Sequence, residues 1–299
     1  MTNTTGEVVR ARLVLSYDGT DFAGWATQPA LRTVQGELED ALARVIRDPA
    51  TGESLAPRLT VAGRTDAGVH ARHQVAHVDI PTAAWTLLPG RSDRTPAQGL
   101  RARLDGVSPP DVTIHEAVEA PPGFDARFSA TQRRYAYRIC DRRELRDPLS
   151  RRHVLWHDEA LDVDSLNRAS ATLTGLRDFT PFCKAREGAT SIRDLTEFSW
   201  ARVDTGPDEG LVVATVKADA FCHSMVRALV GAVLPVGMGR RDLEWLAQVA
   251  TAASRSSAIA VAPAHGLTLE QVTYPADADL AARAEVTRAR RTTPPPQSS

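Results

Sequence analysis

Residues 61–70 read VAGRTDAGVH and place one arginine and one aspartate in a short interval between two glycines. If this stretch is extended, Arg64 and Asp66 point to one face and Thr65 points to the other, because side chains alternate along an extended chain. A guanidinium at that spacing would keep the carboxylate ionised, and the glycines allow a tight turn that exposes it. An exposed carboxylate can serve as a nucleophile, a base or a stabiliser of a cation. The alternative is an aspartate that only builds the turn through bonds to its own backbone.

A second group of residues, rich in arginine, could bind a polyanion. The whole chain of 299 residues has a formal net charge of -1, which gives no reason to expect such a partner. Between Arg127 and Arg152, however, nine arginines stand against three acidic residues. Arginine suits phosphate because its planar guanidinium can bond two oxygens at once. The alternative is a solvated face in a chain that uses arginine in preference to lysine.

Length and composition indicate a folded protein with room for two modest domains. Hydrophobic residues make up 42% and charged residues 24% of the chain. The sequence has no run of about 20 apolar residues, and its polar start lacks the apolar core of a signal peptide, so we expect a cytoplasmic protein. Cys140, Cys183 and Cys222 are too few and too widely spaced for a disulfide framework or a zinc ribbon, and they are predicted to be free thiols.

The elements that must position Asp66 are strands and one helix. ARLVLSY (11–17) alternates apolar and polar residues and ends at the turn sequence DGT, which predicts a strand. Thr33 can cap a helix over VQGELEDALARVI (34–46), where apolar residues recur at helical spacing. Further strands are predicted at 59–64, 73–80 and 111–120, with a loop at 89–99 that is rich in Pro, Gly and Arg.

The second half repeats this order of elements without repeating the sequence. Strands are predicted at 133–140, 192–203, 210–218 and 267–274, and helices at 162–173, 224–236 and 242–253. The predicted fold class is therefore α+β, with two similar α/β subdomains whose mainly antiparallel sheets are flanked by helices. The first domain is expected at 9–122 and carries Asp66, and the second is expected at 123–275. The tail at 276–299 is charged and proline-rich and is predicted to be disordered.

GRTDAGVHA (63–71), followed by QVAHVD (74–79), resembles the signature of the bacterial tRNA pseudouridine synthase A family. Other blocks similar to this family occur in the family's order over roughly residues 10–275. They are YDGTDFAGW (17–25), VQGELEDAL (34–42), FDARFSATQRRYAYRI (124–139), DFTPF (178–182), DAFCHSMVRALVG (219–231) and AHGL (264–267). The chain departs from the family pattern at Ala26, Asp219 and Ser224, which affects local substrate contacts.

The resemblance implies a role for each candidate site residue. Asp66 is the catalytic carboxylate, and Arg64 holds it and helps the target nucleotide to leave its stack. Tyr135 stacks on the flipped uracil and helps to move the C5 proton, while Leu267 forms an apolar wall of the base pocket. Without the family, Tyr135 is a half-buried strand aromatic and Leu267 is core. Arg133 and Arg134 lie in the same segment as Tyr135, which favours their contact with RNA phosphate.

The implied reaction breaks the N1–C1′ bond of a uridine in RNA, rotates the uracil and joins C5 to C1′, with no cofactor and no metal. The implied substrate is the anticodon stem-loop of tRNA at positions 38, 39 and 40, bound by a homodimer. The active-site cleft is expected between the two domains. A stacked base is inaccessible, so the target nucleotide must be extruded before the reaction. The alternative is a non-catalytic protein that binds or folds RNA on the same scaffold, although such a binder needs no carboxylate facing an anion.

Two other enzyme classes fit less well. SYDGT (16–20) is similar to the motif of haloacid-dehalogenase-like phosphatases, but Ser16 stands where the nucleophilic aspartate is needed. GMG at 237–239 lacks the spacing of a nucleotide-binding loop. Neither motif predicts a second activity.

Histidines and one cysteine suggest two further sites. His70, His73 and His77 could bind zinc, but the segment alternates as a strand and the first of them lies in the turn, so convergence would be fortuitous. Cys222 beside His223 resembles a thiol hydrolase pair, yet adjacent side chains diverge. We expect neither a metal site nor a thiol nucleophile.

Overall fold

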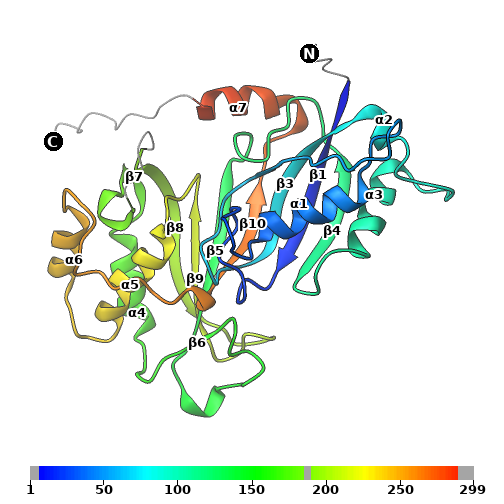
Figure 1. Cartoon of the computed structure of the whole chain (residues 1–299). Helices are drawn as coiled ribbons and strands as arrows, with labels where there is room; N and C mark the ends of the chain where they lie inside the picture. Colours follow the sequence, from blue (N-terminus) through cyan, green and yellow to red (C-terminus); the bar gives the residue numbers. More distant parts are fainter. Residues whose placement is uncertain (1–6, 185–189, 289–299) are drawn as a thin grey trace. The chain divides into compact units, whose positions relative to one another are not determined.

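The computed structural model describes residues 7–184 and 190–288 in two compact units (Figure 1). Within these residues, unit 1 comprises 7–131 and 272–288, and unit 2 comprises 132–271. The chain therefore completes unit 2 and then returns to unit 1. Both units are mixtures of helices and mostly antiparallel strands, so the α+β prediction is confirmed.

Unit 1 is built on antiparallel strands in the order β4-β1-β3. These are β1 (Val8–Tyr17), β3 (His70–Pro81) and β4 (Val112–Glu119), with the short strand β2 (Leu59–Val61) paired to β3. Along β1 alternate residues are buried, as the period-2 pattern predicts. The register between β1 and β3 shifts between Leu15 and Tyr17, which is the irregularity that a bulge produces. The shift lies where β1 approaches the GRTDAG loop.

The helices of unit 1 follow local capping signals. In α1 (Val34–Val45) the hydroxyl oxygen of Thr33 accepts a hydrogen bond from the amide of Gly36, and the apolar residues of the helix are buried as predicted. After α2 (Thr82–Trp85), helix α3 (Pro96–Asp105) begins at a capping box in which Thr95 and Gln98 bond each other's backbone amides. The loop prediction for 89–99 is therefore wrong from residue 96, because the TPAQ cap outweighs the surrounding Pro, Gly and Arg.

Unit 2 is a sheet in the order β10-β5-β9-β8-β7. Its strands are β5 (Gln132–Cys140), β7 (Gly175–Asp178), β8 (Ile192–Arg202), β9 (Val212–Ala218) and β10 (Leu267–Thr273), and β6 (Leu155–Trp156) pairs in parallel with β5. Its helices are α4 (Val163–Ala171), α5 (Met225–Gly237) and α6 (Leu243–Ala250). Helix α4 packs against β8 and α5. Apart from β6 and β7, which were not predicted, these elements match the predicted ones within a few residues.

Helix α5 is almost entirely buried and is followed by the shorter α6. A helix that is apolar all round needs cover on every side, and here α4 and α6 contact it. Among the residues that the structure describes, no helix combines the length and the apolar character that crossing a membrane requires.

Two of the three cysteines do not fit the free-thiol prediction. Cys183 and Cys222 form a disulfide whose Cα atoms are 5.6 Å apart, across a sequence separation of 39 residues. Cys140 is a buried free thiol, as expected. The prediction was therefore wrong for two residues, because sequence spacing does not reveal that the turn after β7 and the segment before α5 meet.

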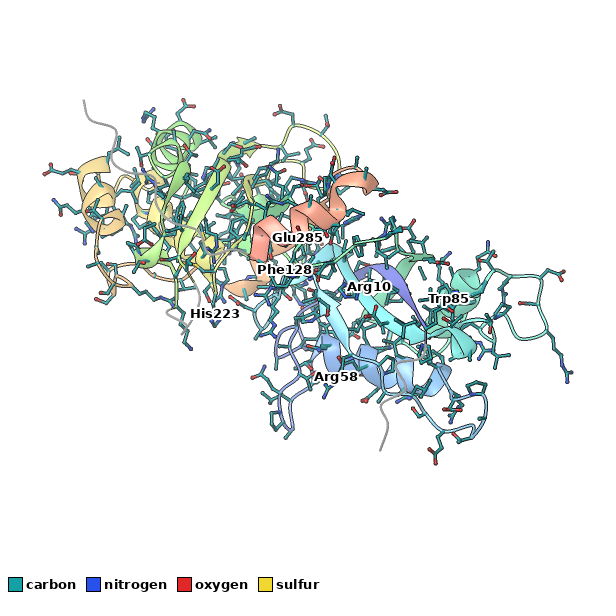
Figure 2. The ribbon with its side chains drawn as sticks, turned by 90° about the horizontal axis from the view of Figure 1, so that it is seen from above. Arg10, Arg58, Trp85, Phe128, His223 and Glu285 are labelled. Carbon is teal, nitrogen blue, oxygen red and sulfur yellow. A yellow bond between two sulfur atoms is a disulfide. The ribbon has the colours of Figure 1, made fainter. Side chains whose placement is uncertain are left out.

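The C-terminal segment of unit 1 corrects the prediction of a disordered tail. Residues 277–288 form η4 (Asp277–Asp279) and α7 (Leu280–Arg288). The hydroxyl of Ser129 donates to the carbonyl of Leu280, and Arg288 lies 4.9 Å from the ring centre of Phe128 beneath α7 (Figure 2). The rest of the predicted tail, 289–299, lies outside the described residues.

Candidate active site

Asp66 lies in the loop between β2 and β3 of unit 1. Thr65 is buried, Arg64 is exposed and Asp66 is half-buried, so consecutive side chains alternate as expected for an extended stretch. The loop then turns through Gly68, whose φ of 76° favours glycine. The amide of Val69 donates to the carbonyl of Asp66 at 3.2 Å, which closes the turn.

The segment after β1 holds this loop from one side. The amide of Trp25 donates to the carbonyl of Thr65 at 3.0 Å, and the amide of Gly68 donates to the carbonyl of Phe22 at 3.3 Å. Gly24 has a φ of +99°, and a Cβ on it would lie 3.0 Å from the carbonyl oxygen of Thr65. The YDGTDFAGW block thus forms a backbone cradle for the loop that carries Asp66.

Two buried side chains, those of Tyr17 and Gln74, hold the same loop from the core. Tyr17 Oη lies 2.8 Å from Thr65 Oγ1, and Gln74 Nε2 donates to Tyr17 Oη at 3.2 Å. Gln74 Nε2 also donates to the carbonyl of Gly63 at 2.8 Å. Burial raises the pKa of Tyr17 to about 12, so its hydroxyl stays neutral near neutral pH.

Arg32 fastens the cradle to the rest of unit 1. Its guanidinium bonds both carboxylate oxygens of Asp111, at 2.7 and 2.9 Å, and lies 2.9 Å from Glu37. The same guanidinium stacks over the ring of Phe22, 4.2 Å from its centre. Arg32 therefore fixes the aromatic residue whose carbonyl accepts from the Asp66 loop.

Tyr135 and Leu267 lie on neighbouring strands of unit 2. Both are buried, and the ring of Tyr135 meets that of Phe221 edge-on with centres 5.2 Å apart. Leu267 is the first residue of β10 and directly follows the turn at 264–266. The hydroxyl of Tyr137, on β5, donates to the carbonyl of Pro263 before this turn, at 2.9 Å. The two residues thus belong to one apolar region of unit 2.

The predicted arginine contacts differ in exposure. Arg133 is buried, and its guanidinium donates to the carbonyl of Asp219 at 2.5 Å, while the half-exposed Arg134 donates to Gln271 at 3.4 Å. Arg138 is also buried, 2.8 Å from Asp208. The members of the run that are exposed in unit 2, here called the arginine patch, are Arg142, Arg143, Arg151 and Arg152.

The predicted site residues therefore fall into two groups. Arg64 and Asp66 lie in unit 1, and Tyr135, Leu267, Arg133 and Arg134 lie on the neighbouring strands β5 and β10 of unit 2. The first group lies on a tightly held turn that presents a carboxylate, and the second surrounds an apolar strand pair with arginine nearby.

Comparison with known proteins adds to this geometry. Residues 169–275 match the model of a family described as tRNA pseudouridine synthase. The tRNA pseudouridine synthase A of Streptomyces griseus is 56% identical over 286 residues, which cover 96% of this chain and 95% of the relative. That of Frankia casuarinae is 54% identical and covers 98% and 99%. The chain belongs to the tRNA pseudouridine synthase A family.

Family membership confirms the resemblance that the GRTDAGVHA block indicates. The cradle and the core contacts of the loop were not predicted from the sequence. Tyr17, Trp25 and Arg32 lie in or near the quoted YDGTDFAGW block, which was the available signal, but no spacing rule connects them with Thr65 across some forty residues. In this family member the block supports the turn that carries Asp66.

Two of the three histidines that the sequence suggested as a zinc site, His70 and His77, bond the backbone. His70 Nδ1 accepts from the amide of Gly19 at 3.0 Å, and His77 Nδ1 accepts from the amide of Ala126 at 3.0 Å. Burial, followed by the nearby charge of Arg10, lowers the pKa of His77 to about 4. In the described ranges, no three His, Cys, Asp or Glu side chains are grouped so that they could hold a metal ion.

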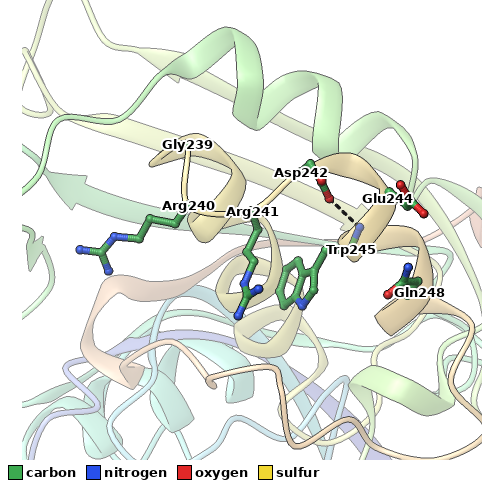
Figure 3. A pocket seen from close by; sticks show the side chains of 7 residues that line it. All are labelled: Gly239, Arg240, Arg241, Asp242, Glu244, Trp245 and Gln248. Carbon is green, nitrogen blue, oxygen red and sulfur yellow. Dashed lines mark hydrogen bonds between the residues drawn. The ribbon is translucent and has the colours of Figure 1, made fainter.

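A cavity of about 570 Å³ lies elsewhere in unit 2, at the turn that follows α5 and along α6 (Figure 3). Arg241 lies 5.4 Å from the ring centre of Trp245, and Arg240 forms an ion pair with Glu159. The cavity is lined by Gly239, Arg240, Arg241, Asp242, Glu244, Trp245 and Gln248. It contains none of the predicted site residues.

Proposed function

We propose that this protein is a tRNA pseudouridine synthase, an isomerase that converts uridine to pseudouridine. The observation that carries the proposal is the double support of the Asp66 loop, by the backbone of Trp25 and by the side chain of Tyr17. An aspartate that only built its turn would not need such support. A catalytic carboxylate does, because it must be held in one direction to act on a sugar carbon.

The reaction moves one bond and conserves the atoms of the nucleotide. The N1–C1′ bond breaks, the uracil rotates, C5 bonds to C1′, and the C5 proton is lost while N1 gains a proton. Asp66 can attack C1′ as a nucleophile, stabilise a cation-like sugar or remove a sugar proton. All three routes require the ionised carboxylate. Arg64 holds Asp66 and helps the nucleotide to leave its stack.

Unit 2 supplies the proposed base pocket. Tyr135 stacks on the extruded uracil and helps to move the C5 proton, and Leu267 forms an apolar wall. The burial of both residues and the contact of Tyr135 with the ring of Phe221 support this role, since a flipped base is held by aromatic and apolar side chains. The cleft that would join this pocket to Asp66 is part of the proposal.

The substrate is the anticodon stem-loop of tRNA, with uridines 38, 39 and 40 as targets. The arginine patch supports RNA binding, because exposed guanidinium groups neutralise phosphates. Arg134, on β5, can also bind phosphate, while the buried Arg133 acts indirectly by holding the carbonyl of Asp219 in place. A homodimer in the cytoplasm, acting without cofactor or metal, completes the proposal and rests on the family resemblance and the sequence alone.

The proposal is tested by mapping pseudouridine in tRNA from cells with and without this protein, and in unmodified tRNA incubated with the purified protein. We expect pseudouridine at 38, 39 and 40 to disappear from the cells and to appear in the tube. Addition of EDTA should leave the reaction intact once the tRNA is folded. Binding of tRNA without any pseudouridine formation would instead identify a non-catalytic binding protein.

A further inference from the structure

The buried contacts beneath the Asp66 loop form one chain of hydrogen bonds. Tyr17, Thr65 and Gln74 are 4%, 6% and 0% exposed, so water cannot substitute for their partners. Gln74 Nε2 is 2.8 Å from the Gly63 carbonyl and 3.2 Å from Tyr17 Oη, and Tyr17 Oη is 2.8 Å from Thr65 Oγ1. The chain reaches both ends of the GRT segment directly before Asp66.

Elementary donor and acceptor rules fix the direction of the two bonds that Gln74 makes. The carbonyl of Gly63 can only accept, so the Gln74 atom facing it is the amide nitrogen. An amide nitrogen only donates, and the oxygen of Tyr17 is therefore the acceptor of its second bond. Either hydroxyl can donate in the bond between Tyr17 Oη and Thr65 Oγ1. Removal of either hydroxyl takes a hydrogen-bond partner from a buried group.

The ring of Tyr17 is itself fixed by the cradle. It meets the ring of Trp25 with centres 6.0 Å apart and that of Phe22 edge-on with centres 6.5 Å apart. The backbone amide of Trp25 also bonds the carbonyl of Thr65. Thr65 is thus held through its side chain by Tyr17 and through its backbone by Trp25, and Asp66 is the next residue.

We propose that Tyr17 is a positioning residue for Asp66, acting through Thr65 and oriented by Gln74. The hydroxyl of Tyr17 keeps the Thr65 side chain in the core, and the alternation of the extended loop then directs the Asp66 carboxylate outward. This inference rests on the proposed catalytic function of Asp66. Tyr17 does not touch the substrate, so it affects the reaction step and leaves RNA binding unchanged.

The test is a set of hydroxyl deletions measured by single-turnover pseudouridine formation and by tRNA binding. Tyr17→Phe keeps the ring contacts and removes only the bond to Thr65. We expect a loss on the order of 10- to 100-fold in the single-turnover rate, since small displacements of a catalytic group have effects of this size. The tRNA affinity should stay within about twofold, because phosphate contacts dominate it.

Tyr274→Phe is the matched control. Tyr274 donates its hydroxyl to the carbonyl of Ala126 at 2.7 Å in the same unit, so this variant also removes a tyrosine hydroxyl that bonds the protein. This variant should keep the wild-type rate. Equal losses of single-turnover rate in Tyr17→Phe and Tyr274→Phe would overturn the proposal, because they would show that the effect of Tyr17 comes from lower stability and not from the position of Asp66.

Thr65 provides the second arm and a rescue. Thr65→Val keeps the branched shape and removes the hydroxyl, whereas Thr65→Ser keeps the hydroxyl that bonds Tyr17. We expect the valine variant to lose as much rate as Tyr17→Phe, the serine variant to recover most of it, and the double variant Tyr17→Phe with Thr65→Val to lose no more than either single one. Additive losses, or a fully active Thr65→Val, would contradict the chain.

Asp66→Asn is measured in the same assay to separate the two hypotheses. An active Asp66→Asn would reject the catalytic role of Asp66 on which the inference rests, and an inactive wild type would reject the proposed function itself. An inactive Asp66→Asn together with a fully active Tyr17→Phe would reject only the positioning role. Because Thr65→Val tests the same bond from its other end, the inference stays testable even if Tyr17→Phe does not fold.

Discussion

The backbone amide of Trp25 donates to the carbonyl of Thr65 at 3.0 Å, so the segment that follows β1 is bonded to the residue directly before Asp66. The two residues are far apart in sequence, and this bond makes the position of the Asp66 loop depend on the conformation of the cradle. Gly24, the neighbour of Trp25, allows the close approach. Substitutions in the cradle should therefore change the rate of pseudouridine formation.

Gly24→Ala should both destabilise unit 1 and slow pseudouridine formation. The new Cβ would lie 3.0 Å from the Thr65 carbonyl oxygen at a φ of +99°, where side chains are strained. The control is Gly52→Ala, which also has a positive φ but has no atom within 4 Å of the new Cβ. Gly52→Ala should cost about 1–2 kcal/mol of unfolding free energy and leave the rate unchanged.

The measurements are urea unfolding and the single-turnover rate at a temperature where both variants are folded. Gly24→Ala should lose more unfolding free energy than Gly52→Ala and should also lose rate. A Gly24→Ala variant with the wild-type rate would show that the cradle does not control the position of Asp66.

The arginine patch should make tRNA binding strongly dependent on salt. Replacing Arg142 and Arg143 by glutamine should weaken binding and reduce the slope of log K against log salt by about one for each arginine. The control is Arg168→Gln on α4, whose side chain is 62% exposed and lies outside the patch. Filter binding over a range of salt concentrations measures the slope for the wild type, the double variant and Arg168→Gln. An unchanged slope in the double variant would place the RNA elsewhere.

Regular patterns and caps in the sequence predicted most of the fold. Thr33 predicted α1 because its hydroxyl is adjacent to the amides it caps, and alternation predicted β1 and β3. The start of helix α3 was missed because the Pro, Gly and Arg content of residues 89–99 favoured a loop and the four-residue cap was not recognised. Helix α7 was missed because its apolar face is narrow and its cover comes from residues near Ser129.

The candidate site was predicted only as far as local motifs reach. Asp66 and Arg64 lie in one continuous motif, and so they could be identified together. The contacts that hold them, from Tyr17 and Gln74, join residues 48 and 11 positions from the ones they bond. The disulfide between Cys183 and Cys222 is a contact of the same kind. Such contacts depend on the tertiary fold, which pattern and spacing do not specify.

His77 should make the stability of unit 1 depend on pH between about 4 and 6.5. Burial holds its folded pKa at about 4, whereas the unfolded value is near 6.5. In this window the unfolded chain binds a proton that the folded chain does not, so the free energy of unfolding rises with pH. The full effect is about 3 kcal/mol, lost as the pH falls from 6.5 towards 4.

Urea unfolding at a series of pH values measures this dependence. His77→Gln should flatten the profile in the window, because glutamine does not titrate. His115→Gln is the control, since this histidine is exposed and its Nε2 lies 2.8 Å from Ser16 Oγ. A His77→Gln profile as steep as that of the wild type would assign the dependence to other groups.

Asp66→Asn should leave the fold and tRNA affinity nearly intact and remove pseudouridine formation. Asparagine keeps the size and shape of aspartate and can build the same turn, at a cost of about 1 kcal/mol or less. It cannot act as a nucleophile, a base or a stabiliser of a cation, and losses on the order of 10⁴-fold or more are typical when such a group is removed.

Asp48 is the matched control, because its carboxylate accepts from the amides of Ala50 and Thr51, at 2.7 and 3.2 Å, in an exposed turn. Tritium release from C5-labelled tRNA, measured beside filter binding, should therefore be abolished in Asp66→Asn and unchanged in Asp48→Asn. Retention of even about a tenth of the wild-type rate by Asp66→Asn would return GRTDAGVH to the role of a turn, since no route through the carboxylate tolerates its loss at that level.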